Sequence, residues 1–214
     1  MSFTSLRVLE NREEVPGVHH IVLSLEGTDL APSYTAGGQY VQLNRGGERP
    51  VYMAIASAPG LDVFEFLIQR TDGTAGLVCS AGVGDTVDCS AAMGGGFPMG
   101  RVEGCRVLMF AGGTGISAVR ALVESKTWDK ARLYYGADAV EDMAYRGLFN
   151  AWSARGVQVV ECIGTFPNVA YANEGDEDCS DTAVILCGPG PMMTAVTELL
   201  VSRGMPAERA LKNY

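Results

Sequence analysis

Apolar and polar residues alternate with a period of two through the first half of the chain, in short runs that turn residues interrupt. Ile21, Leu23 and Leu25 illustrate the pattern, because they share one face of an extended chain. Strands are predicted at 18–25, 40–43, 64–68 and 83–89, with one short helix at 74–80. Short strands with little helix between them are typical of a small antiparallel β-barrel.

The pattern changes from Cys105 onward, where apolar runs alternate with segments of helical periodicity. In the last of these segments, Met192, Val196 and Leu200 share one helix face, and Gly204 follows as a stop signal. Strands are predicted at 105–111, 131–136, 157–163 and 182–187, and helices at 115–126, 140–154 and 191–203. This order predicts an α/β domain with a doubly wound parallel sheet. The chain therefore divides into two predicted domains, residues 1–101 and 102–214.

One segment, residues 168–181 (NVAYANEGDEDCSD), fits neither pattern. It is acidic and weakly periodic, so we expect an exposed, solvated loop.

A turn of small residues, Gly112-Gly113-Thr114-Gly115, joins a predicted strand to a predicted helix. Glycines lack side chains, so the backbone N–H groups at the positive end of the helix can approach a phosphate. The turn therefore predicts a nucleotide site. It is neither GxGxxG nor a P-loop, and a plain strand-to-helix turn remains the alternative.

Composition narrows the class of protein. Hydrophobic residues make up 47% of the 214 residues and charged ones 19%, which is typical of a globular chain. A net charge of −9 disfavours nucleic acid and anionic membranes as partners. The six cysteines and two adjacent histidines have no metal-ligand or iron–sulfur spacing, so no metal is predicted.

Localisation signals are weak. No apolar run approaches the about 20 residues of a membrane span, and the first 17 residues resemble neither a signal peptide nor a transit peptide. We expect a soluble, cytoplasmic protein without membrane insertion. A plastid location is the alternative if a transit peptide has been removed.

Five stretches of the chain match short motifs that occur together, in this order, in one known family. Residues 49–59 (RPVYMAIASAP) are similar to a flavin-binding motif, R-x-Y-S followed by small apolar residues. Residues 73–75 (GTA) are similar to the turn under the FAD pyrophosphate, and 94–97 (GGGF) to a G-x-x-F element. The turn at 112–115 corresponds to the pyrophosphate site of a nicotinamide nucleotide, and 186–193 (LCGPGPMM) to a C-G-P-x-x-M motif. Together they resemble the ferredoxin–NADP reductase superfamily, and most of all its short reductase-like members from plants and algae.

The resemblance implies an FAD-binding barrel followed by a domain that binds NAD(P)H. A flavin ring needs an aromatic or apolar platform on one face, and an arginine fork suits its phosphates. The implied flavin residues are Arg49, Tyr52, Met53, Ala54, Ser57, Gly73, Thr74, Ala75, Phe97 and the terminal Tyr214. The implied nucleotide residues are Gly112, Gly113, Thr114, Gly115, Asp138, Gly188, Pro189 and Met192. Cys187, Tyr214 and Ala54 are expected beside the reacting rings.

The chain departs from the family motif at its Tyr-Ser pair. Counted back from Ser57, that pair falls on Met53-Ala54, whereas counted from Arg49, Tyr52 arrives one residue late. Either Tyr52 or Met53 is therefore the stacking residue. If Ala54 takes the place of the serine, flavin N5 loses a hydroxyl donor, and we expect slower hydride transfer.

The preferred nucleotide is predicted from the end of the second strand of the α/β domain. Asp138 stands where dinucleotide folds place an acid to accept a hydrogen bond from the adenosine ribose. Relatives that use NADP often carry arginine there and near residues 165–167, which read TFP in this chain. NADH is thus favoured over NADPH. The alternative is that Asp138 caps a helix starting near Val140.

These features predict a flavin-dependent oxidoreductase that passes hydride from NAD(P)H to FAD. No iron–sulfur or haem motif occurs, so the electron acceptor is expected to be a separate small protein or small molecule. The rival hypothesis is a catalytically weakened subunit with a binding or structural role in a larger complex. Ala54 and the acidic segment 168–181 favour this rival.

Overall fold

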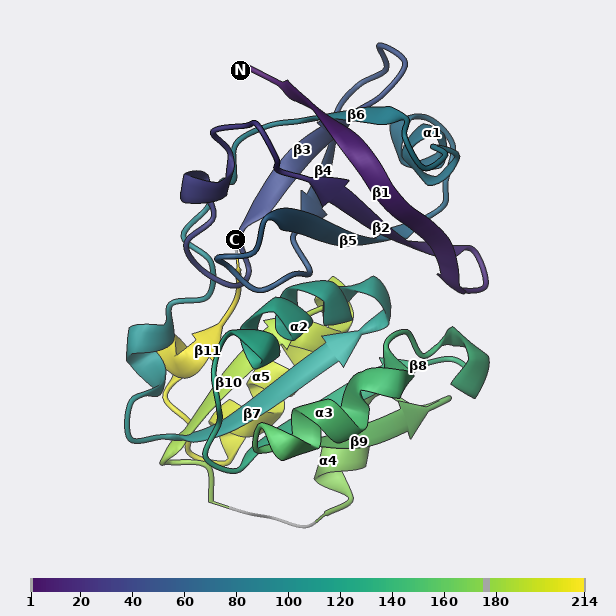
Figure 1. Ribbon diagram of the computed structural model, residues 1–214. Coiled ribbons are helices and arrows are strands. Elements are labelled where there is room, and N and C mark those ends of the chain that lie inside the picture. Colours follow the sequence, from purple (N-terminus) through teal and green to yellow (C-terminus); the bar gives the residue numbers. More distant parts are fainter. Residues whose placement is uncertain (1, 175–177, 214) are drawn as a thin grey trace.

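The computed structural model describes residues 2–174 and 178–213. Its N-terminal half is an antiparallel sheet of six strands in the order β4-β3-β6-β1-β2-β5 (Figure 1). Just after β4, the amide of Ala56 donates to the carbonyl of Glu65 in β5 at 2.7 Å, which joins the edge strands into a barrel. The elements are β1 (Thr4–Val15), β2 (Val18–Ser24), β3 (Tyr40–Asn44), β4 (Val51–Ala54), β5 (Val63–Gln69), α1 (Thr74–Cys79) and β6 (Thr86–Cys89).

The barrel core follows the predicted alternation. Ile21 and Leu23 of β2 and Phe64 and Phe66 of β5 are fully buried in one cluster inside the barrel. The expectation of an antiparallel barrel is confirmed, and so is the short helix predicted at 74–80.

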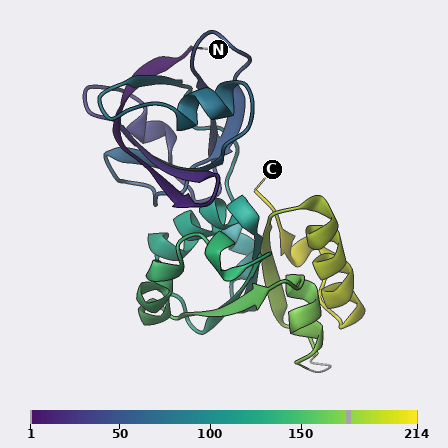
Figure 2. The same ribbon diagram turned by 90° about the vertical axis from the view of Figure 1, so that its right-hand side faces the viewer.

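The C-terminal half is a parallel five-stranded sheet in the order β11-β10-β7-β8-β9. Helices α2 and α3 pack on one face, and α4 and α5 pack on the other (Figure 2). The predicted doubly wound domain is confirmed. Its elements are β7 (Arg106–Gly112), α2 (Ile116–Ser125), β8 (Ala131–Ala137), α3 (Phe149–Ala154), β9 (Val157–Ile163), α4 (Pro167–Ala172), β10 (Thr182–Cys187), α5 (Gly190–Ser202) and β11 (Ala210–Leu211).

The strand order reverses between β7 and β10. The chain leaves β7 outward to β8 and β9, then returns to β10 on the other side of β7. In such sheets, ligands bind at the carboxyl ends of the two strands where the direction reverses. These ends carry the turns at 112–115 and 187–191.

The continuous helix predicted at 140–154 is wrong in its first half. A 3-10 turn at Val140–Asp142 stops, and Tyr145 takes a left-handed φ of 62° before a second 3-10 turn and α3. The amide of Tyr145 donates to Glu14 Oε1 in β1 at 2.9 Å. The predicted helix is thus interrupted where Tyr145 contacts the barrel, and a contact between distant residues leaves no trace in helical periodicity.

The loop predicted at 168–181 is also wrong in its first part, where α4 lies. Pro167 occupies a first-turn position of α4, where proline is tolerated. Tyr171 is buried against the rings of Phe110 and Tyr134, with centroids 5.9 and 5.4 Å away. One buried aromatic thus anchors a short helix whose weak periodicity hid it. Residues 175–177 lie outside the described residues.

The two halves touch at several places besides the connecting chain. The loop before β3 packs on α2, and a β-carbon placed on Gly37 would lie 3.1 Å from the backbone of Leu122. After β11 the chain runs back to the barrel, where Asn213 Nδ2 donates to the carbonyl of Gly38 at 3.0 Å (Figure 1). The domain division predicted at residue 101 falls inside a 3-10 turn, Met99–Val102.

Candidate functional site

Two glycine turns meet at the point where the strand order reverses. A β-carbon on Gly115 would lie 2.6 Å from the carbonyl carbon of Cys187, and one on Gly188 would lie 2.9 Å from the amide nitrogen of Gly112. One on Gly112 would lie 2.9 Å from Pro189 Cδ. The turns after β7 and β10 therefore pack backbone against backbone, which a side chain at these positions would prevent.

Gly113 differs from its neighbours. It has a left-handed φ of 52°, and a β-carbon there would meet no atom within 4 Å. The residue is exposed and faces a cavity, and its turn leads directly into α2. Open space at a helix N-terminus, where N–H groups are unsatisfied, suits an anionic group.

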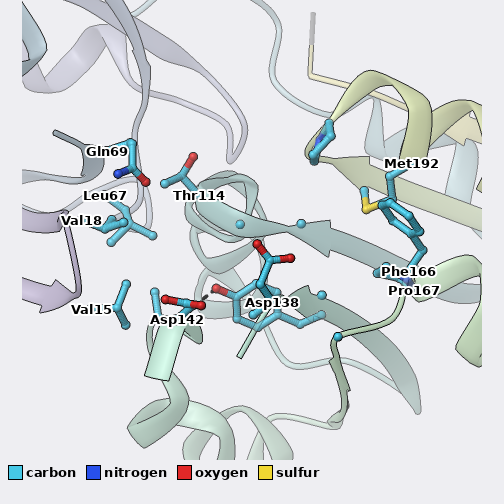
Figure 3. A pocket seen from close by; sticks show the side chains of 18 of the residues that line it. Val15, Val18, Leu67, Gln69, Thr114, Asp138, Asp142, Phe166, Pro167 and Met192 are labelled. Carbon is cyan, nitrogen blue, oxygen red and sulfur yellow. Dashed lines mark hydrogen bonds between the residues drawn. The ribbon is translucent and has the colours of Figure 1, made fainter. Parts of the chain in front are cut away.

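The cavity that Gly113 faces has a volume of about 450 Å³ and lies between the α/β sheet and the barrel (Figure 3). We call it the interdomain cavity. Its lining combines the carboxyl ends of β7, β8 and β9 with the β1–β2 hairpin and the end of β5. Its lining residues include Leu67, Gln69, Gly113, Thr114, Asp138, Asp142, Phe166, Pro189 and Met192.

Two carboxylates face the interdomain cavity. Asp138 is exposed, and the 3-10 turn that follows it starts from Ala139 without a side-chain cap, so Asp138 caps no helix. Asp142 lines the same cavity (Figure 3). Among the described residues, no lysine or arginine lines it, and the ring of Phe166 is 63% exposed there.

A second, broader groove lies on the outer face of the barrel, with a volume of about 760 Å³. We call it the barrel groove. Arg49 is exposed in it, and the described residues show no ion pair with its guanidinium. Thr74 Oγ1 donates to the carbonyl of Arg49 at 2.8 Å, which ties Arg49 to the turn at Gly73. Gly73 has a φ of 72°, a conformation that glycine adopts at little cost.

The alternation along β4 separates Tyr52 from Met53. Tyr52 is 64% exposed on the outer face, with its ring edge-on to Tyr40 at 5.8 Å. Met53 is half-buried and packs against the barrel core. Ala54 shares the outer face with Tyr52 and packs against a cluster of buried residues that both halves contribute to.

The interdomain cavity and the barrel groove adjoin each other. Leu67 and Gln69 on β5 and Thr114 on the glycine turn line both of them. We call the place that these three residues share the junction. Thr114 thus belongs to the α/β half yet borders the groove of the barrel.

Comparison with known proteins identifies the family. No protein-family model matches the chain. It is 31% identical over 213 residues to "Fruit protein pKIWI502" of Actinidia deliciosa, an alignment that covers 86% of this chain and 67% of that protein. The chain belongs to the ferredoxin–NADP reductase superfamily.

Other proteins are also similar to this chain. The gamma subunit of sulfhydrogenase 1 from Pyrococcus furiosus is 27% identical over 202 residues, covering 86% of this chain and 69% of that subunit. A ferredoxin NADP+ reductase structure from Neisseria gonorrhoeae superposes with a TM-score of 0.80 at 19% identity. That likeness covers 95% of this chain and 92% of the other, and it supports the fold.

Not every residue that the superfamily motifs imply lies at the junction. Ser57 is fully buried, and its Oγ donates to the carbonyl of Val63 and accepts from the amide of Glu65. Phe97 is buried in the core between the halves, against Gly38. The structure therefore brings neither side chain to the two cavities.

Cys187 of the C-G-P-x-x-M motif is half-buried, and the lining of neither cavity includes it. Burial raises the pKa of its thiol to about 11, so the group is a neutral thiol near neutral pH. Its carbonyl packs on Gly115, while Pro189 and Met192 reach the interdomain cavity. Tyr214 lies outside the described residues.

The sequence motifs of the superfamily did not point to the barrel side of the junction. Leu67 and Gln69 lie on the face of β5 opposite the buried Phe66. The alternating pattern of β5 predicts polar side chains on this face. An apolar residue there, Leu67, could have indicated that another part of the protein covers this face. Asp142 had no comparable signal.

Among the described residues, no helix is long and apolar enough to cross a membrane. The same residues contain no group of three or more histidine, cysteine or acidic side chains arranged to hold a metal ion.

Proposed function

We propose that this protein is an FAD-containing reductase that takes hydride from a nicotinamide nucleotide, preferentially NADH, and passes electrons to a separate acceptor. The observation that carries the proposal is the junction, where a groove on the barrel meets a cavity at the α/β switch point. A dinucleotide in one and a flavin in the other would approach each other there. Thr114, Leu67 and Gln69 would lie between them.

The barrel groove fits an FAD. The guanidinium of Arg49, which has no ion pair among the described residues, suits a pyrophosphate, and a β-carbon at Gly73 would meet no atom within 4 Å. Tyr52 offers an exposed aromatic face as a platform for the flavin ring. Met53 also lines the groove, but it is half-buried and packs against the barrel core. We therefore assign the stacking role to Tyr52.

The interdomain cavity fits a nicotinamide nucleotide. Gly113 leaves room for the pyrophosphate at the start of α2, and the exposed ring of Phe166 suits the adenine. Asp138 can accept a hydrogen bond from a free ribose hydroxyl. A 2′-phosphate would instead meet Asp138 and Asp142 with no cation in the described lining, so repulsion favours NADH.

When bound, FAD supplies the hydride acceptor and stores the electron pair for onward transfer. The residues of the chain position the two rings and exclude water. Ala54 brings no hydroxyl to the outer face of β4, and Thr114 Oγ1 has no hydrogen-bond partner among the described residues. Thr114 is thus the hydroxyl available at the junction.

Named relatives support a separate electron acceptor. The 206-residue match to the toluate 1,2-dioxygenase electron transfer component of Pseudomonas putida, at 26% identity, covers 86% of this chain and 60% of that protein. Its name, like that of the sulfhydrogenase gamma subunit, describes a component of a larger system. The same names motivate the second candidate function, a subunit with weakened chemistry, which the missing hydroxyl at Ala54 also favours.

The deciding experiment is an absorption spectrum of the purified protein before and after incubation with FAD, followed by anaerobic addition of NADH. We expect a bound flavin spectrum that NADH bleaches. A colourless protein that takes up no FAD would instead support the weakened subunit.

The nucleotide preference has its own test. Asp138→Arg should shift the ratio of kcat/KM for NADH over NADPH by about tenfold or more toward NADPH, because it replaces repulsion by an ion pair. Glu141→Arg is the matched control, since Glu141 is exposed three residues away and lies outside the cavity lining. A wild type that prefers NADPH, or equal ratios in both variants, would remove Asp138 from the site.

A further inference from the structure

A cluster of polar side chains is buried between the barrel and the α/β half, outside the lining of both cavities. At its centre is Arg120 of α2, which is 9% exposed. Its Nη2 lies 2.7 Å from Glu65 Oε2 on β5, and its Nε donates to Glu124 Oε1 at 3.0 Å. We call the pair Arg120–Glu65 the interdomain ion pair.

Neighbouring groups hold the guanidinium in one orientation. Glu124 Oε1 also accepts a hydrogen bond from Trp152 Nε1 at 3.1 Å, which fixes the carboxylate that faces Nε. The guanidinium carbon stands 4.7 Å from the ring centroid of Tyr145. Because guanidinium is planar, fixing Nε and one face also fixes the direction of Nη2 toward the barrel.

The interdomain ion pair joins the two elements that form the junction. Glu65 precedes Leu67 by two residues on the same face of β5, about 7 Å along the strand. Arg120 follows Thr114 by six residues, about 9 Å along the helix axis. A shift of β5 past α2 would therefore change the ion pair and the junction together.

Stability alone does not explain a charged pair at this place. Replacing a buried ion pair by apolar side chains of similar volume is often neutral or stabilising, because both charges must be desolvated. An apolar contact between β5 and α2 would tolerate sliding, whereas a pair at 2.7 Å with a fixed guanidinium does not. The charged pair therefore fixes the position of β5 along α2, which an apolar contact would not do.

We propose that Arg120 and Glu65 are positioning residues that set the register of the glycine turn against β5, and that hydride transfer depends on this register. The inference rests on the proposed function. The reaction that they position is the transfer of a hydride from NADH to the bound flavin, which leaves NAD⁺ and the two-electron-reduced flavin. A displacement of about 1 Å between reacting groups is enough to lower such a rate about 100-fold.

His20 provides an internal reporter of the ion pair. Its Nε2 lies 3.5 Å from Glu65 Oε2, and its Nδ1 lies 3.2 Å from the hydroxyl of Tyr145. Burial lowers the pKa of His20 to about 4, and the charges of Arg12 on β1 and Arg120 on α2 act in the same direction. Glu10 on β1 opposes them.

When the positive charge of Arg120 is removed, protonated His20 should replace it as the cation that faces Glu65. In Arg120→Met, one nearby cation is lost and Glu65 keeps His20 as its partner, so the pKa of His20 rises. The rise is partial, because burial and Arg12, the two larger causes of the low pKa, remain. Below that pKa, a protonated imidazole would restore a positive charge opposite Glu65. The ratio of the flavin reduction rate in the variant to that in the wild type should therefore increase as the pH falls.

The kinetic arm uses the FAD-loaded protein and anaerobic stopped-flow measurement of flavin reduction at saturating NADH. Arg120→Met should reduce the rate constant at pH 8 at least tenfold, while the Kd for NAD⁺ measured by calorimetry changes less than threefold. As the pH is lowered from 8 to 5, the rate constant of the variant should recover in part relative to that of the wild type, because a growing fraction of His20 becomes protonated. The double variant Arg120→Met/His20→Gln should show no recovery.

The second arm needs no flavin. Amide hydrogen exchange of the apoprotein should be faster in Arg120→Met within 64–69 and 113–119, the segments that the pair joins. Arg132→Met is the matched control: Arg132 makes an ion pair with Glu174 at 2.6 Å inside the α/β half and also lies over a tyrosine ring. It should change neither exchange in these segments nor the reduction rate.

Each outcome decides one of the two claims. If the wild type binds no FAD, or if NADH does not reduce it, the proposed function is wrong. The exchange measurement would still test the coupling of the two segments. Wild-type reduction rates in Arg120→Met, or equal losses in Arg132→Met, overturn the positioning role. If Arg120→Met does not fold, Glu65→Gln removes the same charge pair with little change of shape and should lower the rate in the same direction.

Discussion

Protonation of His20 should make the stability of this protein depend on pH. His20 is 5% exposed at the interface of the halves, and burial, then Arg12 and Arg120, lower its pKa from 6.5 to about 4. The folded state therefore keeps the imidazole neutral at pH values where the unfolded chain binds a proton. The stability linked to this group is complete above about pH 6.5 and decreases as the pH falls toward 4.

The size of the effect follows from the two pKa values. At pH 5, an unfolded-state pKa of 6.5 and a folded-state pKa of about 4 give a loss of about 2 kcal/mol from this residue. For a chain of this length, about 2 kcal/mol corresponds to roughly 4–8 °C in Tm. Acidic groups add their own pH dependence, so the quantity to compare is the difference between variants.

The assay is urea unfolding at pH 7.5 and pH 5 at constant ionic strength. His20→Gln keeps a polar group near Tyr145 but cannot titrate, so its stability should fall by about 2 kcal/mol less than that of the wild type between the two pH values. His19→Gln is the matched control, because His19 is the neighbouring histidine and contacts Asn11 at 2.8 Å instead. Equal pH dependence in the wild type and His20→Gln would refute the reasoning, as would a loss of the effect in His19→Gln.

The glycine turn and β4 give two further predictions. Gly113→Val should raise the KM for the nucleotide severalfold with flavin still bound, because its side chain enters open space that the ligand needs. Gly115→Ala should instead cost about 1–3 kcal/mol in urea unfolding, because its β-carbon presses on the Cys187 carbonyl; unchanged stability would contradict that packing. Tyr52→Ala should weaken FAD binding about tenfold in a fluorescence titration, through loss of a stacking face. Met53→Ala should mainly reduce stability, by about 2 kcal/mol, and the reverse result would exchange the two assignments.

Local pattern was sufficient to predict the architecture. Strands β7 to β10 lie within one residue of their predicted positions. Strands β7 and β10 are buried on both faces of the parallel sheet and therefore appear as nearly uninterrupted apolar runs. The barrel strands β2 and β5 followed from alternation. The strands that were not predicted have weak local signals: half of the residues of β1 are exposed, and β4 and β11 have only four and two residues.

The glycine turn shows where local pattern ends. The sequence predicted that 112–115 must be small, but not for which reason at each position. Gly112 and Gly115 are small because a turn more than 70 residues later packs on them, whereas Gly113 is small beside open space. Only the folded chain brings Cys187 and Gly188 to that place.

Tertiary structure also changed the roles of individual side chains. Ser57 belongs to a stretch that resembles a flavin motif, yet its hydroxyl is used inside the barrel. For Asp138, the structure bears on the capping alternative alone: the turn that follows it starts from Ala139 and has no side-chain cap.

The interdomain ion pair had no sequence signal at all. Glu65 and Arg120 are separated by 55 positions and lie in different domains, and each is an ordinary charged residue in its own element. Secondary structure follows from contacts between near neighbours, which leave a periodic pattern in the sequence. Register between two domains arises from contacts between distant residues, and these leave no period, so the fold must form before they can be recognised.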